Sequence, residues 1–525
     1  MKGLLNGKKL NPWIFWPPFL IFVIASILSI VAFDDFTGAI NAIFNWVVTN
    51  FGWFFTISAF GAVVLCAVVF FSSAGKIKFG GKDAEPEFKT WEWFAISLTA
   101  GIGTGIVFWG VAEPITHFSS PPPGLGIESF SAEAANFAMR TVFLHWTFTP
   151  YALYILFAIP IALAIYNYNQ PFKVSSGLYF LIGDRCSGWI GKATDALTIF
   201  ALAGGVAAVL GAGLLQMGSG LNFLFNIPIT PVLWIIIAIV IIASYTISSY
   251  TGLDKGIKFL ANQNTKIFLG TMIFVFVVGP TTFILDIGTQ GFGEFLSNFL
   301  NQSFYLSPVA EGSWPTWWTV YFWANWLAFA PIVGLFLVRL TKGRTIREFI
   351  AVNLIAPALF GMVWFAVYGG AAIHAQLNGI MDLSASMAEH GLEHAIFSFF
   401  QMFPLGGIIS VVFLITIAVS FITLADSMTS TLAMVSTRGL EETEEAPLVL
   451  KIFWGVFIGV ISVVMIVYAG VDGFKMLSNL AGFPIAFLLI GIGASLIKGL
   501  YYPDAVWFKQ VGKVQKNHNK KEQEV

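Results

Sequence analysis

Long apolar stretches separated by short polar segments run along the chain from about residue 13 to residue 500. The hydrocarbon core of a bilayer is about 30 Å thick, so a spanning helix needs about 20 apolar residues. Windows of that length predict twelve transmembrane helices near 13–33, 51–72, 94–111, 140–166, 190–216, 231–250, 266–288, 315–339, 348–373, 405–436, 448–470 and 476–500. The pattern therefore predicts an all-α polytopic membrane protein without a soluble domain.

The basic residues fall in alternate connecting segments. With the N-terminus placed inside, every one of the 27 Lys and Arg except Arg140 and Lys475 lies in an inside segment. Lys and Arg collect in the cytoplasmic loops of membrane proteins, and a wrong number of spans would remove this segregation. We therefore predict a multi-pass protein of the cell membrane with both termini in the cytoplasm.

The composition narrows the class of protein further. Hydrophobic residues make up 57% of the chain and charged residues only 10%, whereas soluble proteins carry about 25% charged residues. This excludes a water-soluble enzyme, and the net charge of −1 gives no reason to expect a nucleic-acid partner. The two distant cysteines form neither a disulfide framework nor a zinc pattern. The spans lack a clustered catalytic set and a polar pore stripe, so we expect neither an enzyme with a cofactor nor a channel.

Two of the predicted helices contain residues that interrupt helical structure. The third has Gly101, Gly103 and Gly105 within five residues, and each Gly weakens a helix by about 1 kcal/mol relative to Ala. The eighth contains Pro331, which removes a backbone donor, and Gly334 lies one turn later. Close packing of helices through small residues is the alternative for the glycines. Because five spans separate the two helices, we predict two inverted repeats, helices 3–7 and 8–12, with a binding site between them.

These predictions divide the chain into five parts. They are a cytoplasmic N-terminus at 1–12, two peripheral helices with a loop at 13–92, a first five-helix repeat at 93–290, a second at 291–502 and a short basic cytoplasmic tail at 503–525. The lysines of the tail are expected to interact with anionic membrane lipid.

Aromatic side chains gather on helices 4 and 8. Helix 4 carries Trp146, Tyr151 and Tyr154, and helix 8 carries Trp326 and Phe329. Aromatic rings at helical spacing usually serve packing, and Trp at a membrane boundary usually anchors the helix, but Trp326 and Phe329 lie in the middle of their span. A quaternary ammonium has no N–H to donate, and the faces of aromatic rings attract it by about 2 kcal/mol or more when desolvated. With backbone N–H groups of an interrupted helix available for a carboxylate, the pattern predicts a methylammonium zwitterion as ligand.

Three segments resemble the signatures of the betaine/carnitine/choline transporter (BCCT) family. They are Gly101–His117, Trp326–Gly334 followed by Arg339–Phe349, and Phe421–Ser427. The resemblance covers nearly the whole chain. It implies a LeuT-like core of two five-helix repeats preceded by two extra helices, secondary active transport of a trimethylammonium or related zwitterion, and a homotrimer.

The resemblance also implies which residues bind the substrate. Phe329 and Asn325 stand where similar betaine transporters have Trp, and Phe is a weaker partner for a cation than Trp. Gly105 matches members that take betaine-like zwitterions, whereas members of the choline type have Asp there. The implied substrate-binding residues are Trp146, Tyr151, Tyr154, Trp326, Phe329, Asn325, Gly101, Gly103, Thr104 and Gly105.

A sodium site is implied by the same resemblance, but one of its expected oxygens is missing. The neighbour of Thr423 that would supply a second hydroxyl is Leu424, and hard cations require oxygen ligands. We expect a weakened or absent Na⁺ site, which leaves sodium coupling, proton coupling and sodium-independent exchange of carnitine- or butyrobetaine-type substrates open; a non-transporting membrane sensor is a more remote alternative. The implied ion-binding residues are Thr99, Ile102, Ser420 and Thr423.

Other polar residues in or beside the spans have a functional and a structural interpretation. Asp426, in the middle of helix 10, is either a functional carboxylate or a neutral, hydrogen-bonded one. We expect Glu113 and Arg140 to form a structural ion pair, and His145 to serve packing rather than proton relay. For His390 and His394, which have the spacing of metal ligands on a helix, we expect a solvated stretch rather than a metal site. All of these residues except Asp426 are predicted to lie toward the outer side of the membrane.

Overall fold

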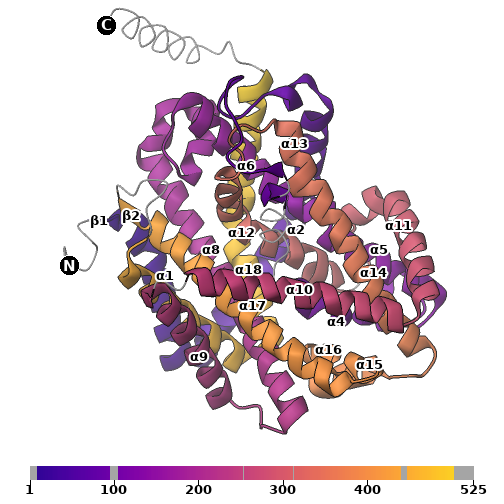
Figure 1. Cartoon of the computed structure of the whole chain (residues 1–525). Coiled ribbons are helices and arrows are strands. Elements are labelled where there is room, and N and C mark those ends of the chain that lie inside the picture. The colour runs from indigo at the N-terminus through magenta and orange to yellow at the C-terminus, as the bar shows by residue number, and fades with distance from the viewer. Residues whose placement is uncertain are drawn as a thin grey trace, which may run out of the picture.

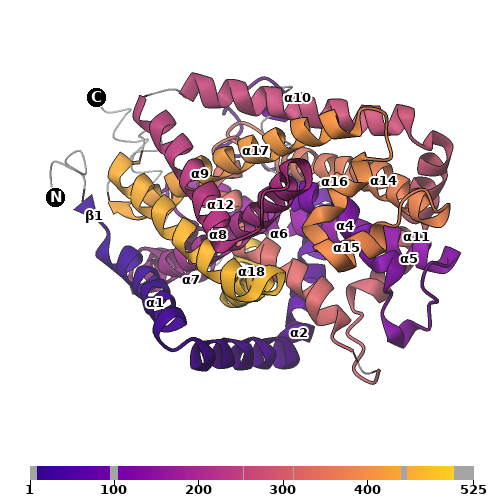
Figure 2. The same ribbon diagram turned by 90° about the horizontal axis from the view of Figure 1, so that it is seen from below.

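The computed structural model describes residues 9–90, 92–94, 105–251, 254–310, 312–438 and 446–501. Within these ranges the chain is helical except for connecting segments and two short strands, β1 (Lys9–Leu10) and β2 (Thr437–Arg438), which pair in antiparallel orientation. The long helices form a bundle with α6, α8 and α12 near its centre and α1 and α2 at its edge (Figures 1 and 2).

The helices follow one another along the chain with short connections. The N-terminal part contains α1 (Pro12–Val31), α2 (Phe33–Phe71) and η1 (Ser73–Lys76). The middle part contains α4 (Gly105–Ser119), η2 (Pro123–Leu125), α5 (Ala132–Trp146), α6 (Phe148–Tyr168), η3 (Val174–Leu178), α7 (Tyr179–Ile182), η4 (Gly183–Ser187), α8 (Trp189–Phe225), α9 (Pro231–Thr251), α10 (Asp254–Val278) and α11 (Thr281–Ser303). The C-terminal part contains η5 (Thr316–Val320), α12 (Tyr321–Val338), α13 (Ile346–Ile350), η6 (Ala351–Ile355), α14 (Ala356–Leu377), α15 (Leu383–His390), η7 (Leu392–His394), α16 (Ala395–Phe400), α17 (Gly406–Val435) and α18 (Leu448–Tyr501).

The described residues include nine helical stretches that are long and apolar enough to cross a membrane, or ten if α10 and α11 count as one bent span. The apolar part of α9, Pro231–Ile247, is shorter. The predicted third span lies partly in 95–104, outside the described residues, and α18 contains two of the nine stretches. The prediction of an all-helical, polytopic membrane protein is confirmed at this level.

One predicted span is not a continuous helix. The window 266–288 covers the end of α10 and the start of α11, which meet at an angle of 107°. Gly279 and Pro280 stand at the bend, and a helix usually ends at or before the residue that precedes a proline. The helix α11 then packs against α5 and α14 at the side of the bundle instead of continuing α10.

The proline in helix 4 interrupts the helix, whereas the proline in helix 8 does not. The predicted span 140–166 is divided at Thr147, whose ψ of −113° is not helical, so that α5 ends at Trp146 and α6 begins at Phe148. Pro150 cannot donate a hydrogen bond to the carbonyl of Trp146, and its ring crowds that carbonyl. In contrast, α12 remains helical through Pro331, so the interruption expected there is absent; its irregular part is η5, a wide π-helical turn at its start.

Segments that were predicted to share one side of the membrane meet at one end of the bundle. Strand β1 near the N-terminus pairs with β2 after α17. The loop after α2 meets the loop after α12 through a bridge between Lys78 and Thr345. Asn167 at the end of α6 accepts a hydrogen bond from the N–H of Gly80 and donates one to the carbonyl of Lys78. This grouping agrees with the pattern of basic residues along the chain.

Two arginines of this end stabilise the connections between helices. Arg347 donates from Nε to the carbonyl of Phe70 at 2.8 Å and from Nη2 to that of Ser72 at 2.9 Å, at the C-terminus of α2. The last carbonyls of a helix lack partners within it, and a basic side chain satisfies them. Arg344 donates to the carbonyl of Phe88 at 2.7 Å and lies over the ring of Trp93.

Candidate functional site

Four of the aromatic residues predicted to bind the ligand lie together, and we call them the aromatic cluster: Trp146, Tyr151, Tyr154 and Trp326. The ring of Trp326 lies 5.5 Å from Trp146, 5.8 Å from Tyr151 and 5.4 Å from Tyr154, measured between centroids. The rings are steeply inclined to one another, at 78°, 60° and 62°. No ring in the cluster is more than 6% exposed, so the cluster is closed to solvent in this conformation.

The cluster forms where α12 packs against the junction of α5 and α6. Trp146 is the last residue of α5, and Tyr151 and Tyr154 lie in the first two turns of α6. The indole Nε1 of Trp326 donates to the carbonyl of His145 at 3.2 Å. His145 lies in the last turn of α5, where carbonyls need a partner from outside the helix. The interruption at Thr147 therefore both places Trp146 and presents a carbonyl that fixes Trp326.

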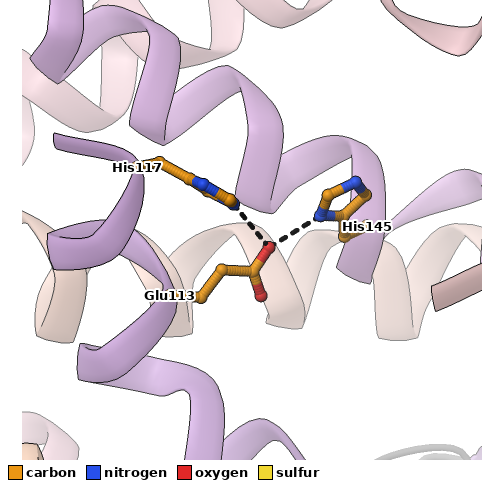
Figure 3. A group of neighbouring side chains, drawn as sticks. All are labelled: Glu113, His117 and His145. Carbon is orange, nitrogen blue, oxygen red and sulfur yellow. Dashed lines mark hydrogen bonds and ion pairs between the residues drawn. The ribbon is translucent and has the colours of Figure 1, made fainter. Parts of the chain in front are cut away.

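A buried carboxylate, Glu113 of α4, lies next to the cluster. Its Oε2 accepts a hydrogen bond from Trp146 Nε1 at 2.6 Å. Its Oε1 lies 2.7 Å from His145 Nδ1 and 3.3 Å from His117 Nε2, as Figure 3 shows. The other nitrogen of His145, Nε2, lies 3.0 Å from the hydroxyl of Thr319 in η5. All of these side chains except Trp146 are fully buried.

Glu113, His117 and His145 also have the residue types of a metal site, with one ligand atom from each lying within 4.8 Å of the others. Two ligand atoms on one tetrahedral zinc are separated by about 3.4 Å, given bonds of about 2.1 Å. The distance of 2.7 Å between Glu113 Oε1 and His145 Nδ1 is shorter than this and is typical of a charge-assisted hydrogen bond. The second carboxylate oxygen is engaged by Trp146. The geometry is that of a carboxylate held by three N–H donors.

Lys475 forms a second group beside the site. It was assigned to an outer loop by its sequence position, but it lies within α18 and is only 4% exposed. Its ammonium nitrogen lies 5.2 Å from the ring centroid of Trp109, 4.2 Å from that of Trp318 and 5.2 Å from that of Tyr321. It also donates to the carbonyl of Trp317 at 3.3 Å. In the sequence, only a lone lysine between two apolar runs pointed to this group. Its ring partners lie far away along the chain, in α4, η5 and α12.

The other predicted substrate-binding residues lie in different surroundings. Phe329 packs toward α8, since a Cβ added to Gly205 would lie 3.1 Å from its ring. Asn325 accepts a hydrogen bond from Ser478 of α18 at 3.0 Å. Gly105 borders the cluster, because a Cβ there would lie 3.0 Å from the Trp146 ring. The remaining members of the glycine strip, Gly101, Gly103 and Thr104, lie outside the described residues.

Two of the predicted ion-binding residues lie on α17, and the other two, Thr99 and Ile102, lie outside the described residues. Ser420 donates to the carbonyl of Thr416 at 2.9 Å and accepts a hydrogen bond from Asn264 Nδ2 at 2.6 Å. Thr423 donates to the carbonyl of Val419 at 2.5 Å. Both hydroxyls are therefore bonded to the carbonyl four residues earlier in their own helix, a common arrangement for Ser and Thr inside helices.

Two predictions about the outer polar residues are corrected. Arg140 pairs with Glu294 of α11 at 3.4 Å, not with Glu113, which faces the interior. The stretch around His390 and His394 is solvated only in part: His390 is exposed, whereas His394 is buried and its Nδ1 lies 3.3 Å from the Ser219 hydroxyl. Burial disfavours the charged imidazolium and lowers the pKa of His394 to about 4.

His145 is fully buried, and both of its ring nitrogens have polar partners, Glu113 and Thr319. These contacts fit packing and proton relay alike, so the expectation that His145 serves packing stays a prediction. Asp426 is half-buried on α17.

Known proteins similar to this chain are membrane transporters. The model of the betaine/carnitine/choline family transporters matches residues 13–504. A probable glycine betaine transporter of Desulfitobacterium hafniense is 36% identical over 471 residues, which cover 89% of this chain and 93% of that protein. The osmo-dependent choline transporter BetT2 of Acinetobacter baylyi is 34% identical over 505 residues, covering 94% and 72%. An ectoine/hydroxyectoine transporter of Virgibacillus pantothenticus is 33% identical over 500 residues, covering 94% and 98%.

Proposed function

The chain belongs to the betaine/carnitine/choline transporter family, and from that premise we propose that it carries a betaine-like quaternary ammonium zwitterion across the cell membrane by alternating access. It is a membrane transporter and not an enzyme. The observation that carries the choice of ligand is the aromatic cluster, formed by four residues of α5, α6 and α12 and buried inside the bundle. A quaternary ammonium offers no hydrogen-bond donor, so ring faces are the chemistry that selects it.

In this conformation the cluster is closed. No ring of the cluster is more than 6% exposed, so a ligand in solution does not reach the ring faces. Binding therefore requires the segments around the cluster to move. The closed rings support a transport cycle in which the site opens to one side of the membrane at a time.

The packing of the helices supports two inverted five-helix repeats within twelve spans. The first helix of each proposed repeat packs against the second helix of the other: α4 contacts α14, and α12 contacts α6. The third helices, α8 and α17, contact each other. Such reciprocal pairs are what a pseudo-two-fold axis in the membrane plane produces. We retain the division into repeats at 93–290 and 291–502, with both termini cytoplasmic, and a homotrimer as the assembly.

The substrate we favour is glycine betaine or a close relative. Relatives of the chain are named as transporters of glycine betaine, choline and ectoine, and Gly105 beside Trp146 leaves the cluster without the acidic side chain that a choline-type member has. Sodium-independent exchange of carnitine- or butyrobetaine-type substrates is the second candidate, favoured by Leu424 and by the bonded hydroxyls of Ser420 and Thr423. Na⁺ stays a proposed coupling ion with a weakened site.

Binding to the purified protein tests the proposal. Calorimetric titration with glycine betaine, carnitine, γ-butyrobetaine, choline and ectoine is expected to show the highest affinity for a betaine-like zwitterion. Trp326→Leu and Trp146→Leu remove one ring face each, which costs about 2 kcal/mol, or a loss of affinity of about 30-fold. Trp189→Leu is the matched control, because Trp189 is 77% exposed on α8. Unchanged affinity in the two cluster variants, or no binding of any quaternary ammonium, contradicts the proposal.

A further inference from the structure

Glu113 touches the aromatic cluster through a single hydrogen bond. Its carboxylate accepts three N–H donors from three directions: Trp146 at 2.6 Å, His145 at 2.7 Å and His117 at 3.3 Å. The other ring nitrogen of His145, Nε2, lies 3.0 Å from the Thr319 hydroxyl, which can serve as its partner while Nδ1 donates to Glu113. The carboxylate is thus held in one place by α4, α5 and η5.

A purely structural role does not account well for a charge at this position. Burying a carboxylate is costly, and replacing a buried charged group with apolar side chains of similar volume is often neutral or stabilising. A buried carboxylate elsewhere in the bundle, Asp195 of α8, accepts hydrogen bonds from the backbone N–H and the hydroxyl of Ser175. Glu113 differs because one of its donors is the indole of a ring in the cluster.

A carboxylate on an indole N–H changes what the ring offers to a cation. The attraction of a cation to Trp depends on the negative potential at the ring faces. An anion bonded to the N–H pushes electron density into the indole, so both faces become more negative. The charge-assisted hydrogen bond also fixes the ring plane, which lies at 78° to Trp326. A charged group nearby, the ammonium of Lys475, lies over the rings of Trp109, Trp318 and Tyr321.

We propose that Glu113 is a positioning residue for the onium site, which orients the Trp146 indole and makes its faces more attractive to the positive head of the ligand. The inference rests on the proposed function, because it takes the cluster to be the onium site. It predicts that the charge of Glu113 sets the affinity for a cationic head and not the affinity for a neutral one of the same shape.

The test compares two ligands on the purified full-length protein. Glycine betaine carries a trimethylammonium head, and 3,3-dimethylbutanoate has the same shape and carboxylate but a neutral head. Glu113→Gln is expected to lower the affinity for glycine betaine about tenfold, which is less than the loss expected from removing a whole ring. The affinity for the neutral analogue is expected to stay unchanged. Asp195→Asn, the matched control, is expected to leave both affinities unchanged. A merely structural role for Glu113 would weaken both ligands together.

A double-mutant cycle with Trp146→Phe gives the second readout. Phe keeps a ring but has no N–H, so Glu113→Gln is expected to have little further effect on glycine betaine in that background. Ultraviolet resonance Raman difference spectra are expected to show a weaker indole hydrogen bond in Glu113→Gln. If that variant does not fold, Glu113→Asp, which keeps the charge, is expected to retain the preference for glycine betaine over the neutral analogue.

Four results would overturn the inference. They are wild-type affinity in Glu113→Gln, an equal loss for both ligands, additive losses in the cycle, and one tightly bound zinc per chain in metal analysis, which would make Glu113 a metal ligand. Failure of the proposed function looks different, because then Trp326→Leu also leaves the affinity for glycine betaine unchanged.

Discussion

Ser420 and Thr423 on α17 carry the hydroxyls of the proposed, weakened Na⁺ site. Ser420 already accepts a hydrogen bond from Asn264, and Leu424 supplies no oxygen. We expect uptake of glycine betaine into proteoliposomes to change by less than about fivefold when K⁺ replaces Na⁺, below the usual coupling between two ligands. Leu424→Ser restores a hydroxyl and is expected to increase the dependence on Na⁺. A steep sodium dependence of the unmodified protein would contradict this.

The residues of the aromatic cluster could be predicted from the sequence, whereas the contacts of the residues around the cluster could not. Trp146, Tyr151 and Tyr154 follow one another along a short stretch, and Trp326 lies at the middle of an apolar span, so spacing and the family resemblance single them out. The contact of Glu113 with Trp146 joins α4 to α5, and sequence spacing carries no information about such a contact between helices.

The close approach of α12 to α6 rests on a missing side chain. A Cβ on Gly334 would lie 2.9 Å from Phe157 Cβ and 3.2 Å from both the backbone nitrogen of Ala158 and the carbonyl of Tyr154. Small residues allow membrane helices to pack backbone to backbone. Gly334→Ala is therefore expected to destabilise the protein by about 1–3 kcal/mol through overpacking, measured as a lower melting temperature in detergent.

The matched control for Gly334 is Gly270→Ala on α10, where an added Cβ meets open space. There the better helix propensity of Ala is expected to keep or raise the melting temperature, by up to about 1 kcal/mol of stability. An equal decrease in both variants would show that Gly334 does not serve close packing.

At the scale of the helices, hydropathy located most membrane spans but not the positions where the helices bend or end. An apolar window averages over a proline, and the effect of that proline depends on its surroundings. Pro150 and Pro280 stand at helix ends, whereas α12 absorbs Pro331 and remains helical. The Gly279–Pro280 pair was a local signal for the bend that the window 266–288 missed. The wide turn η5 has no comparable signal in the sequence.

For the whole molecule, we predict which end of the bundle faces the cytoplasm. Lys82, in the loop after α2, and Glu128, before α5, are both exposed, and the basic-residue pattern assigns them to opposite sides of the membrane. In a background without Cys66 and Cys186, Glu128→Cys is expected to react with a membrane-impermeant maleimide in intact cells. Lys82→Cys is expected to react only after permeabilisation, and the reverse result would invert the topology.

Lys475 of α18, whose ammonium lies among aromatic rings, helps to interpret ligand affinities of the transporter. The ammonium of Lys475 lies 4.2 Å from the Trp318 ring and is tethered covalently, so it occupies its aromatic surroundings at every ligand concentration. It is an internal reference for what such rings contribute to holding a cation in the interior of this protein. The stability cost of removing that cation can be measured without knowing the substrate, and it gives the scale against which any candidate ligand of the aromatic cluster is judged.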